Sequence, residues 1–373
     1  MPKHTGRAPR RRPAAAGAAV LAALVLTATA CGPDGPGAPA PPPAALPRAV
    51  PTGPDDLAGW KLEDWTRYVA DSGSAEEAPP DAWTAGRMAA AKGRPTPEYP
   101  LASAPAGVQH DAPPPAGRAV PQPRPYGPAS AVVGRLFAGT AHGDTACSGT
   151  VVSDPANPGR SNLVYTAAHC LHEGGGGGWL KGVTFVPGYN RDGGAVRGRP
   201  ATEQQLAPYG RWTAVRALVS PTWLREGGVG ARHQYDYGIV RVRGEEASGP
   251  SLEEVVGAAV PVWFNAPREQ VTSAAAYGYP AERPSDGLEL DRCDAATAPG
   301  RLSFDRARPP MYVIGCPMTG GADGGGWFIT KDGKPNLVSV TALGGRTPDG
   351  YLAGPALQDQ AKRAFDFFSK STR

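Results

Sequence analysis

Short runs of β-branched and aromatic residues, separated by turns that contain Gly and Pro, recur from about residue 131 onward and limit the folds that this chain can adopt. Many short strands with few helices predict an all-β sandwich or barrel. The sequence Asp332-Gly333 between two apolar runs predicts a tight hairpin. The predicted strands are 131–139, 182–188, 212–220, 237–243, 259–264, 274–280, 311–315 and 327–330.

Helical periodicity is confined to three places. Two short helices are predicted before the β-rich region, at 55–70 and 81–93. A longer helix is predicted after the last strand, with Pro355 opening it. Its apolar face comprises Leu357, Ala361, Ala364, Phe365 and Phe368.

Residues 1–30 have the layout of a secretory signal peptide, with basic residues at 3–12 and a run of apolar and small residues at 14–30. Ala28-Thr29-Ala30-Cys31 resembles a bacterial lipobox, in which the cysteine thiol receives a diacylglycerol group. Ordinary cleavage after Ala30 is the alternative, because Ala-x-Ala also fits. We therefore expect export, either as a lipoprotein held on the outer face of the cytoplasmic membrane through Cys31, or as a secreted protein.

Gly and Pro account for 50 and 43 of the 373 residues, and their concentration locates the linkers. Residues 31–56 are rich in Pro, Ala and Gly, which predicts a semi-rigid tether. Residues 57–130 are either a pro-segment or N-terminal extension that packs on the next domain, or a partly disordered stalk. The β-rich domain is assigned to 131–373. Without the basic leader the net charge is near zero, so no nucleic-acid partner is expected.

Three motifs indicate chemistry. Cys147-Ser148-Gly149 precedes Thr166-Ala167-Ala168-His169-Cys170, and Tyr235-Asp236-Tyr237-Gly238 opens a later apolar run. Together they resemble the trypsin-like (chymotrypsin-fold) serine peptidases, most closely the secreted bacterial type. The resemblance covers about residues 130–368. It implies two six-stranded antiparallel β-barrels with a C-terminal helix.

The resemblance also implies the roles of single residues. His169 would be the catalytic base and Asp236 the buried acid that orients it. The Gly-x-Ser-Gly-Gly motif of the family falls on 321–325, where Asp323 stands in place of the nucleophilic serine. Backbone N–H groups of Gly321 and Asp323 would form the oxyanion hole, and Ser339 would lie on the strand that pairs with a bound peptide.

Five cysteines are present, and lipidation of Cys31 would leave four, which allow three pairings. The resemblance implies a bridge between Cys147 and Cys170. Cys293 and Cys316 then remain, and Cys316 leads into the loop with Asp323.

Asp323 makes catalysis doubtful, because a carboxylate has no hydroxyl for His169 to activate. We expect an inactive peptidase homologue that holds a peptide or protein in its cleft, as a monomer and without a cofactor. The alternative is a hydrolase that uses His169 and Asp236 with an unrecognised nucleophile. A metal site from His169, Asp236 and Asp323 is disfavoured, because an orienting Asp faces the far side of the imidazole.

Overall fold

The computed structural model describes residue 64 and residues 82–226, 229–246, 248–345 and 350–371. The predicted signal peptide at 1–30, the tether at 31–56 and the helix at 55–70 fall outside these residues, except for Asp64, which is helical. None of the helices in the described part is long and apolar enough to cross a membrane.

The first half of the domain is a closed barrel. Its strands are β4 (Val133–Thr140), β5 (Gly143–Val152), β6 (Leu163–Thr166), β7 (Lys181–Pro187), β8 (Trp212–Val219) and β9 (Gly238–Arg243). They pair in the order β5-β4-β7-β8-β9-β6, and β6 returns to β5. The strands are rich in Val, Leu, Phe and Tyr, and most of their side chains are buried, which gives the barrel a filled apolar interior.

The second half consists of two five-stranded sheets, ordered β15-β14-β10-β11-β3 and β16-β17-β13-β12-β2, in which β2 is Gln109–His110 and β3 is Ala119–Pro121. The strands are β10 (Ala275–Gly278), β11 (Asp291–Asp294), β12 (Gly300–Ser303), β13 (Met311–Gly315), β14 (Gly326–Lys331), β15 (Lys334–Val340), β16 (Leu343–Gly345) and β17 (Tyr351–Pro355). Asp332 and Gly333, both with positive φ of 52° and 75°, form the predicted hairpin turn between β14 and β15. The all-β prediction is confirmed.

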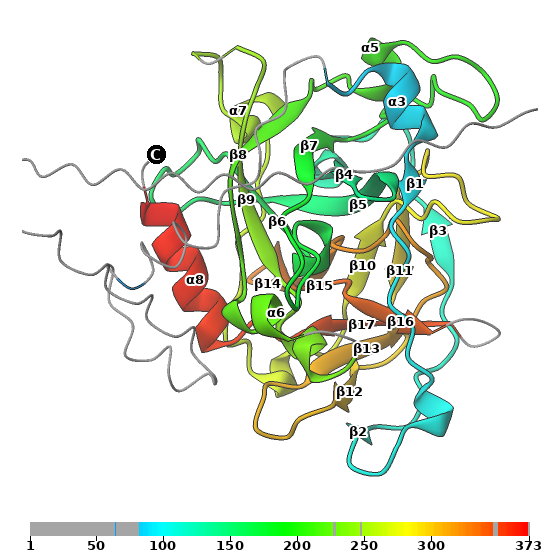
Figure 1. The fold of residues 1–373 in the computed structure, drawn as a ribbon, viewed down its shortest axis with the longest axis vertical. Coiled ribbons are helices and arrows are strands. Elements are labelled where there is room, and N and C mark those ends of the chain that lie inside the picture. The colour runs from blue at the N-terminus through cyan, green and yellow to red at the C-terminus, as the bar shows by residue number, and fades with distance from the viewer. Residues whose placement is uncertain (1–63, 65–81, 227–228, 247, 346–349, 372–373) are drawn as a thin grey trace, which may run out of the picture. The chain divides into compact units, whose positions relative to one another are not determined.

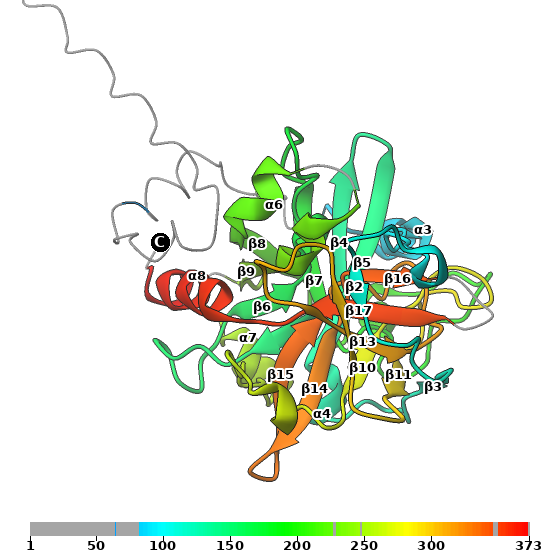
Figure 2. The ribbon, with the colours of Figure 1, turned by 90° about the horizontal axis from the view of Figure 1, so that it is seen from below.

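The region before residue 131 contributes to all three sheets. β1 (Lys92–Gly93) pairs with β5, β2 (Gln109–His110) with β12 and β3 (Ala119–Pro121) with β11. Just ahead of β1, Trp83 and Met88 are buried in the core of the first barrel. Figures 1 and 2 show the blue-to-cyan segment passing from α3 (Ala85–Ala90) beside the first barrel to β2 beside the second half. Residues 82–130 therefore pack on the domain.

Short helices occupy the connections between strands. They are η1 (Leu101–Ser103), α4 (Pro128–Ala131), η2 (Ala168–Cys170), α5 (Glu203–Leu206), α6 (Pro221–Arg225), η3 (Ala231–Tyr235), α7 (Leu252–Val256) and η4 (Arg268–Gln270). The predicted C-terminal helix is α8 (Asp359–Lys370), with its Ala and Phe face buried as expected. The helix predicted at 81–93 is the shorter α3.

Two sequence predictions are wrong in detail. Residues 259–264 form no strand, only isolated bridges from Val260 to Val152 and from Val262 to Leu337. Pro261 lies between them and lacks the N–H that a ladder requires. Pro355 does not open the terminal helix, because it is the last residue of β17 and pairs with Met311.

Candidate active site

Two disulfides hold the segments that carry the candidate catalytic residues. Cys147 of β5 is bonded to Cys170, directly after His169, with their Cα atoms 6.1 Å apart. Cys293 of β11 is bonded to Cys316, just after β13. Both predicted pairings are confirmed. Because the first bridge ties η2 to a barrel strand, the backbone that carries His169 has little freedom to move.

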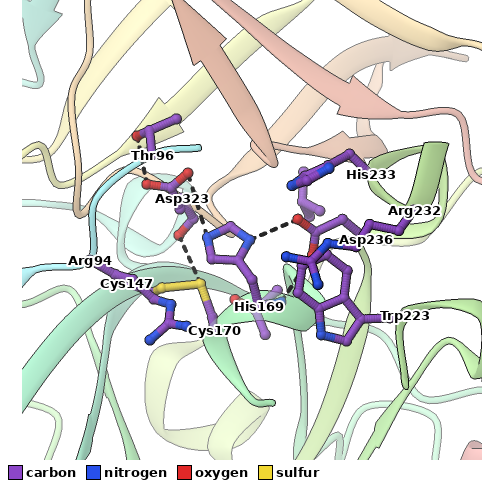
Figure 3. Close-up of polar contacts among 12 residues, drawn as sticks. Arg94, Thr96, Cys147, His169, Cys170, Trp223, Arg232, His233, Asp236 and Asp323 are labelled. Carbon is purple, nitrogen blue, oxygen red and sulfur yellow. Dashed lines mark hydrogen bonds and ion pairs between the residues drawn. A yellow bond between two sulfur atoms is a disulfide. The ribbon is translucent and has the colours of Figure 1, made fainter. Parts of the chain in front are cut away.

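The structure brings His169 and Asp236 together. Nδ1 of His169 lies 2.7 Å from Oδ2 of Asp236, and the backbone N–H of His169 donates to Oδ1 at 3.0 Å (Figure 3). Both side chains are buried. Burial alone would raise the pKa of Asp236, but the charge and hydrogen bonds of His169 hold it below its ordinary value. The ionised carboxylate therefore fixes the orientation of the imidazole.

An aromatic wall supports this pair. The ring of Trp223 lies 6.1 Å from that of His169, and His233 meets Trp223 edge-on at 5.6 Å. The guanidinium of Arg232 lies 4.0 Å from the centre of the Trp223 ring. Burial lowers the pKa of His233 to about 4, so this imidazole is neutral at pH 7 and does not compete with His169 for the charge of Asp236.

Glycines and backbone hydrogen bonds fix the loop that carries Asp323. Gly324 has a φ of 77°, and a Cβ there would lie 2.0 Å from the hydroxyl of Thr166, so no other residue fits. The N–H of Ser148 donates to the carbonyl of Asp323 at 2.7 Å. The hydroxyl of Ser148 donates to the carbonyl of Gly321 at 2.8 Å. The direction of the Asp323 side chain is therefore set by the barrel behind it.

The carboxylate of Asp323 faces the nitrogen of His169 that Asp236 does not contact. Its Oδ1 lies 3.6 Å from Nε2 of His169, and its Oδ2 accepts a hydrogen bond from the hydroxyl of Thr96 at 2.7 Å. Burial raises the pKa of Asp323 to about 6, against the opposing effects of His169 and Thr96. In a Ser-His-Asp triad the nucleophilic hydroxyl lies at this nitrogen.

No family model matches the sequence, and no curated protein matches it. Solved structures do. A thermostable serine protease, AL20, from an extremophilic microorganism is 27% identical over an alignment that covers 66% of this chain and 100% of that one, with a TM-score of 0.53. Protease Anisep from Arthrobacter nicotinovorans is also 27% identical, over 71% of this chain and 100% of that one, with a TM-score of 0.50.

The chain has the fold of the chymotrypsin-like serine proteases. The closed first barrel, the second curled β region and the C-terminal helix all match that architecture. The His169–Asp236 contact lies between β6 and β9 of the first barrel, and Asp323 lies in the loop between β13 and β14 of the second half. The candidate site therefore draws on both halves of this serine protease fold.

The backbone N–H of Gly321, predicted for the oxyanion hole, is already used within the molecule. It donates to the carbonyl of Arg94 at 3.0 Å, and the N–H of Arg94 donates to the carbonyl of Ala146 at 2.7 Å. The second predicted donor, the N–H of Asp323, interacts with the carboxylate of its own residue. A substrate carbonyl would have to replace Arg94 to reach the hole.

Sequence reasoning missed Arg94 and Thr96. Pro95 and Pro97, which follow them, favour an extended backbone at both positions. This local pattern indicates an extended segment and says nothing of its partners. Nothing near residue 96 indicates a partner at residue 323, because the two positions are 227 residues apart.

Ser339 lies in β15 with its side chain buried, and its hydroxyl donates to the carbonyl of Pro355 at 2.9 Å. Gly344, further along the chain in β16, exchanges backbone hydrogen bonds with Pro97 and Tyr99. The Ser339 hydroxyl therefore ties β15 to β17.

The candidate residues do not converge on one metal position. Asp236 and Asp323 face opposite nitrogen atoms of the same imidazole. Cys147, His169 and Cys170 lie close enough together to suggest a ligand set, but both sulfur atoms belong to the disulfide and are not available as thiolates.

Proposed function

We propose that this chain is a serine protease homologue that does not hydrolyse peptides and whose cleft binds an extended peptide. The observation that carries the proposal is the wholly buried Asp323 carboxylate, 3.6 Å from Nε2 of His169. A Ser-His-Asp triad needs a hydroxyl at that position, because the imidazole removes its proton to create the attacking alkoxide. An ionised carboxylate has no proton to give and attacks an amide poorly.

The alternative, hydrolysis through another nucleophile, has less support. Nε2 of His169 has no hydrogen-bond partner among the described residues, so none of their serines is presented to it. The hydroxyl of Thr96 is directed to Asp323 and not to the imidazole. Activation of a water molecule by Asp323 and His169 would still lack a free oxyanion donor at Gly321.

Two features of the cleft support peptide binding. Its walls are formed by β5 of the first barrel and by Gly344 in β16 of the second half, and their backbone groups pair with residues 92–99. An extended peptide adds to the edge of a sheet in the same way. A cavity of about 760 Å³ lies beside Pro95, Thr96 and Glu98, with Met318 and Gly344 in its lining. This cavity adjoins the segment on the side of the second half.

We predict that the wild-type protein releases no products from a broad peptide mixture and forms no adduct with a serine-directed organophosphate, because residue 323 has no hydroxyl. Mass spectrometry of both reactions is the measurement. The same assays on Gly93→Ala separate a missing nucleophile from a blocked cleft, since a Cβ at Gly93 would lie 2.5 Å from the carbonyl oxygen of Gly320 and disfavours docking of the segment.

Hydrolysis by either protein that disappears when His169→Ala is added would overturn the proposal. Asp323→Ser restores the composition of the triad. Activity in Asp323→Ser alone would support a loss of catalysis through this one position, and inactivity would support further change in the cleft.

We also propose export and lipid attachment at Cys31, from the basic and apolar leader and the lipobox-like Ala28-Thr29-Ala30-Cys31. The wild-type protein is expected to partition with membranes, and Cys31→Ala is expected to release it as a soluble species into the medium. Fractionation of cells, followed by mass spectrometry of the N-terminal peptide, checks this. A wild-type protein that is already soluble, with an unmodified Cys31, would contradict lipidation.

A further inference from the structure

Residues 92–99 cross the cleft and are bonded to both of its walls. Arg94 bridges Ala146 of the first barrel and Gly321 of the second half through its backbone N–H and carbonyl, as described above. Beside the second half, the N–H of Gly344 donates to the carbonyl of Pro97, and the N–H of Tyr99 donates to the carbonyl of Gly344, both at 2.9 Å. The segment is thus bound as an added strand, with contacts on either side of Asp323.

The segment runs parallel to both walls. Lys92 pairs with Thr145 and Gly93 with Ala146 in parallel register, and the bridge from Glu98 to Gly344 is also parallel. Parallel and antiparallel strands use different hydrogen-bond patterns. The walls therefore specify the direction of the chain that they bind as well as its extended conformation.

The centre of the segment has a defined chemistry. Thr96 donates its hydroxyl to Oδ2 of Asp323 at 2.7 Å. A Cβ on Gly344 would lie 3.1 Å from Cγ2 of Thr96, so the methyl group of Thr96 fits against a position that has no side chain. A buried carboxylate without partners is costly, and this hydroxyl is a direct donor to it.

The prolines on either side of Thr96 suit this binding mode. Pro95 and Pro97 have no N–H group that would need an acceptor. The N–H groups that donate to the walls belong to Arg94 and Tyr99. Each proline holds φ near the extended value before binding, which lowers the entropic cost of ordering the segment. A salt bridge of 3.0 Å between the side chains of Arg94 and Glu173 also holds the N-terminal part of the segment.

We propose that the cleft is a strand-addition site for an extended peptide that runs parallel to its walls and places Thr or Ser, between two prolines, against Asp323, and that residues 92–99 are its resident ligand. The proposal rests on the proposed role of the cleft as a peptide site and names the class of ligand. An outside peptide with the same pattern binds only when it replaces the resident segment.

The test uses the full chain and two glycine variants. In Gly93→Ala the added methyl meets the backbone of Gly320 at 2.5 Å, whereas at Gly86, an exposed position of α3, an added methyl meets nothing within 4 Å. By hydrogen exchange, the amides of Arg94 and Tyr99 are expected to be protected in the wild type and in Gly86→Ala. Gly93→Ala is expected to raise their exchange rates by about tenfold or more, while the barrel amides stay protected.

A labelled synthetic peptide with the sequence of residues 90–101 is the binding probe. It is expected to bind Gly93→Ala and not the wild type. Its Thr→Val form, which keeps the shape but loses the hydroxyl, is expected to bind at least about tenfold more weakly, because a hydrogen bond to a charged group is lost. Its Thr→Ser form is expected to bind. A peptide of reversed sequence is expected not to bind.

Two results would overturn the proposal: exchange at Arg94 and Tyr99 as fast in the wild type as in the free peptide, or equal binding of the Thr and Val peptides to Gly93→Ala. Neither depends on hydrolysis, so the absence of catalysis is judged separately. If Gly93→Ala does not fold, Thr96→Val in the full chain replaces it. Faster exchange in Thr96→Val but not in Thr96→Ser is then expected, and equal exchange in the two would overturn the proposal.

Discussion

Replacing Asp323 with Asn is expected to raise the free energy of unfolding by about 3 kcal/mol at pH 8 and to leave it nearly unchanged below pH 4. Burial raises the pKa of Asp323 from its ordinary 3.8 to about 6 in the folded protein. Between these values the folded state holds a proton that the unfolded state has lost, so stability falls as the pH rises through this window. The asparagine does not titrate and can still accept the hydrogen bond from Thr96.

Urea unfolding of both proteins from pH 4 to pH 8 is the measurement. The difference between the two curves cancels the titration of groups present in both, such as His233, whose pKa burial lowers to about 4, and Asp291, whose pKa burial raises to about 6. Asp332→Asn is the matched control, because the side chain of Asp332 is 89% exposed at the hairpin turn, where no such difference is expected. An Asp323→Asn protein that is less stable than the wild type at pH 8 would contradict the argument and show that the charged carboxylate contributes to folding.

Removing either disulfide by a pair of Cys→Ala substitutions is expected to lower the free energy of unfolding by about 3 kcal/mol, because each bridge restricts the unfolded chain. The two pairs form a matched set, since both close loops with a sequence separation of 23. Their local effects should differ. Loss of Cys147–Cys170 should raise hydrogen exchange around His169, and loss of Cys293–Cys316 should raise it in the loop that leads to Asp323.

Chemical unfolding and hydrogen exchange on the two double variants check these expectations. If removing either disulfide lowers the free energy of unfolding by less than about 1 kcal/mol, the entropy of loop closure does not account for the contribution of that disulfide. Faster exchange around His169 in both variants alike would show that the two bridges support one common unit.

The first barrel and the His169–Asp236 contact could be predicted because their signals are local. Alternating β-branched and aromatic residues mark most of the barrel strands, and Thr166-Ala167-Ala168-His169-Cys170 is a contiguous motif. The turn at Asp332-Gly333 is equally local, since both residues tolerate positive φ. In each case neighbouring residues determine the structure.

The path of residues 92–121 could not be predicted in this way. β1, β2 and β3 have only two or three residues each, too few for any periodicity to be recognised. Their partners lie in distant strands, and the contact from Thr96 to Asp323 spans 227 positions. The presence of residues 92–99 in the cleft depends on tertiary pairing alone, so no local sequence pattern indicates it.

The position of the cleft segment near the start of the chain sets an order of assembly. β2 and β3 pair with β12 and β11, so residues 109–121 find their strand partners only after the second half of the domain has been made. Such long-range pairing forms late, because the entropy of closing long loops must be overcome first. Residues 109–121 therefore stay without their strand partners until β11 and β12 are available. During synthesis, residues 94–99 likewise cannot pair with Gly321 and Gly344 until those residues have been made.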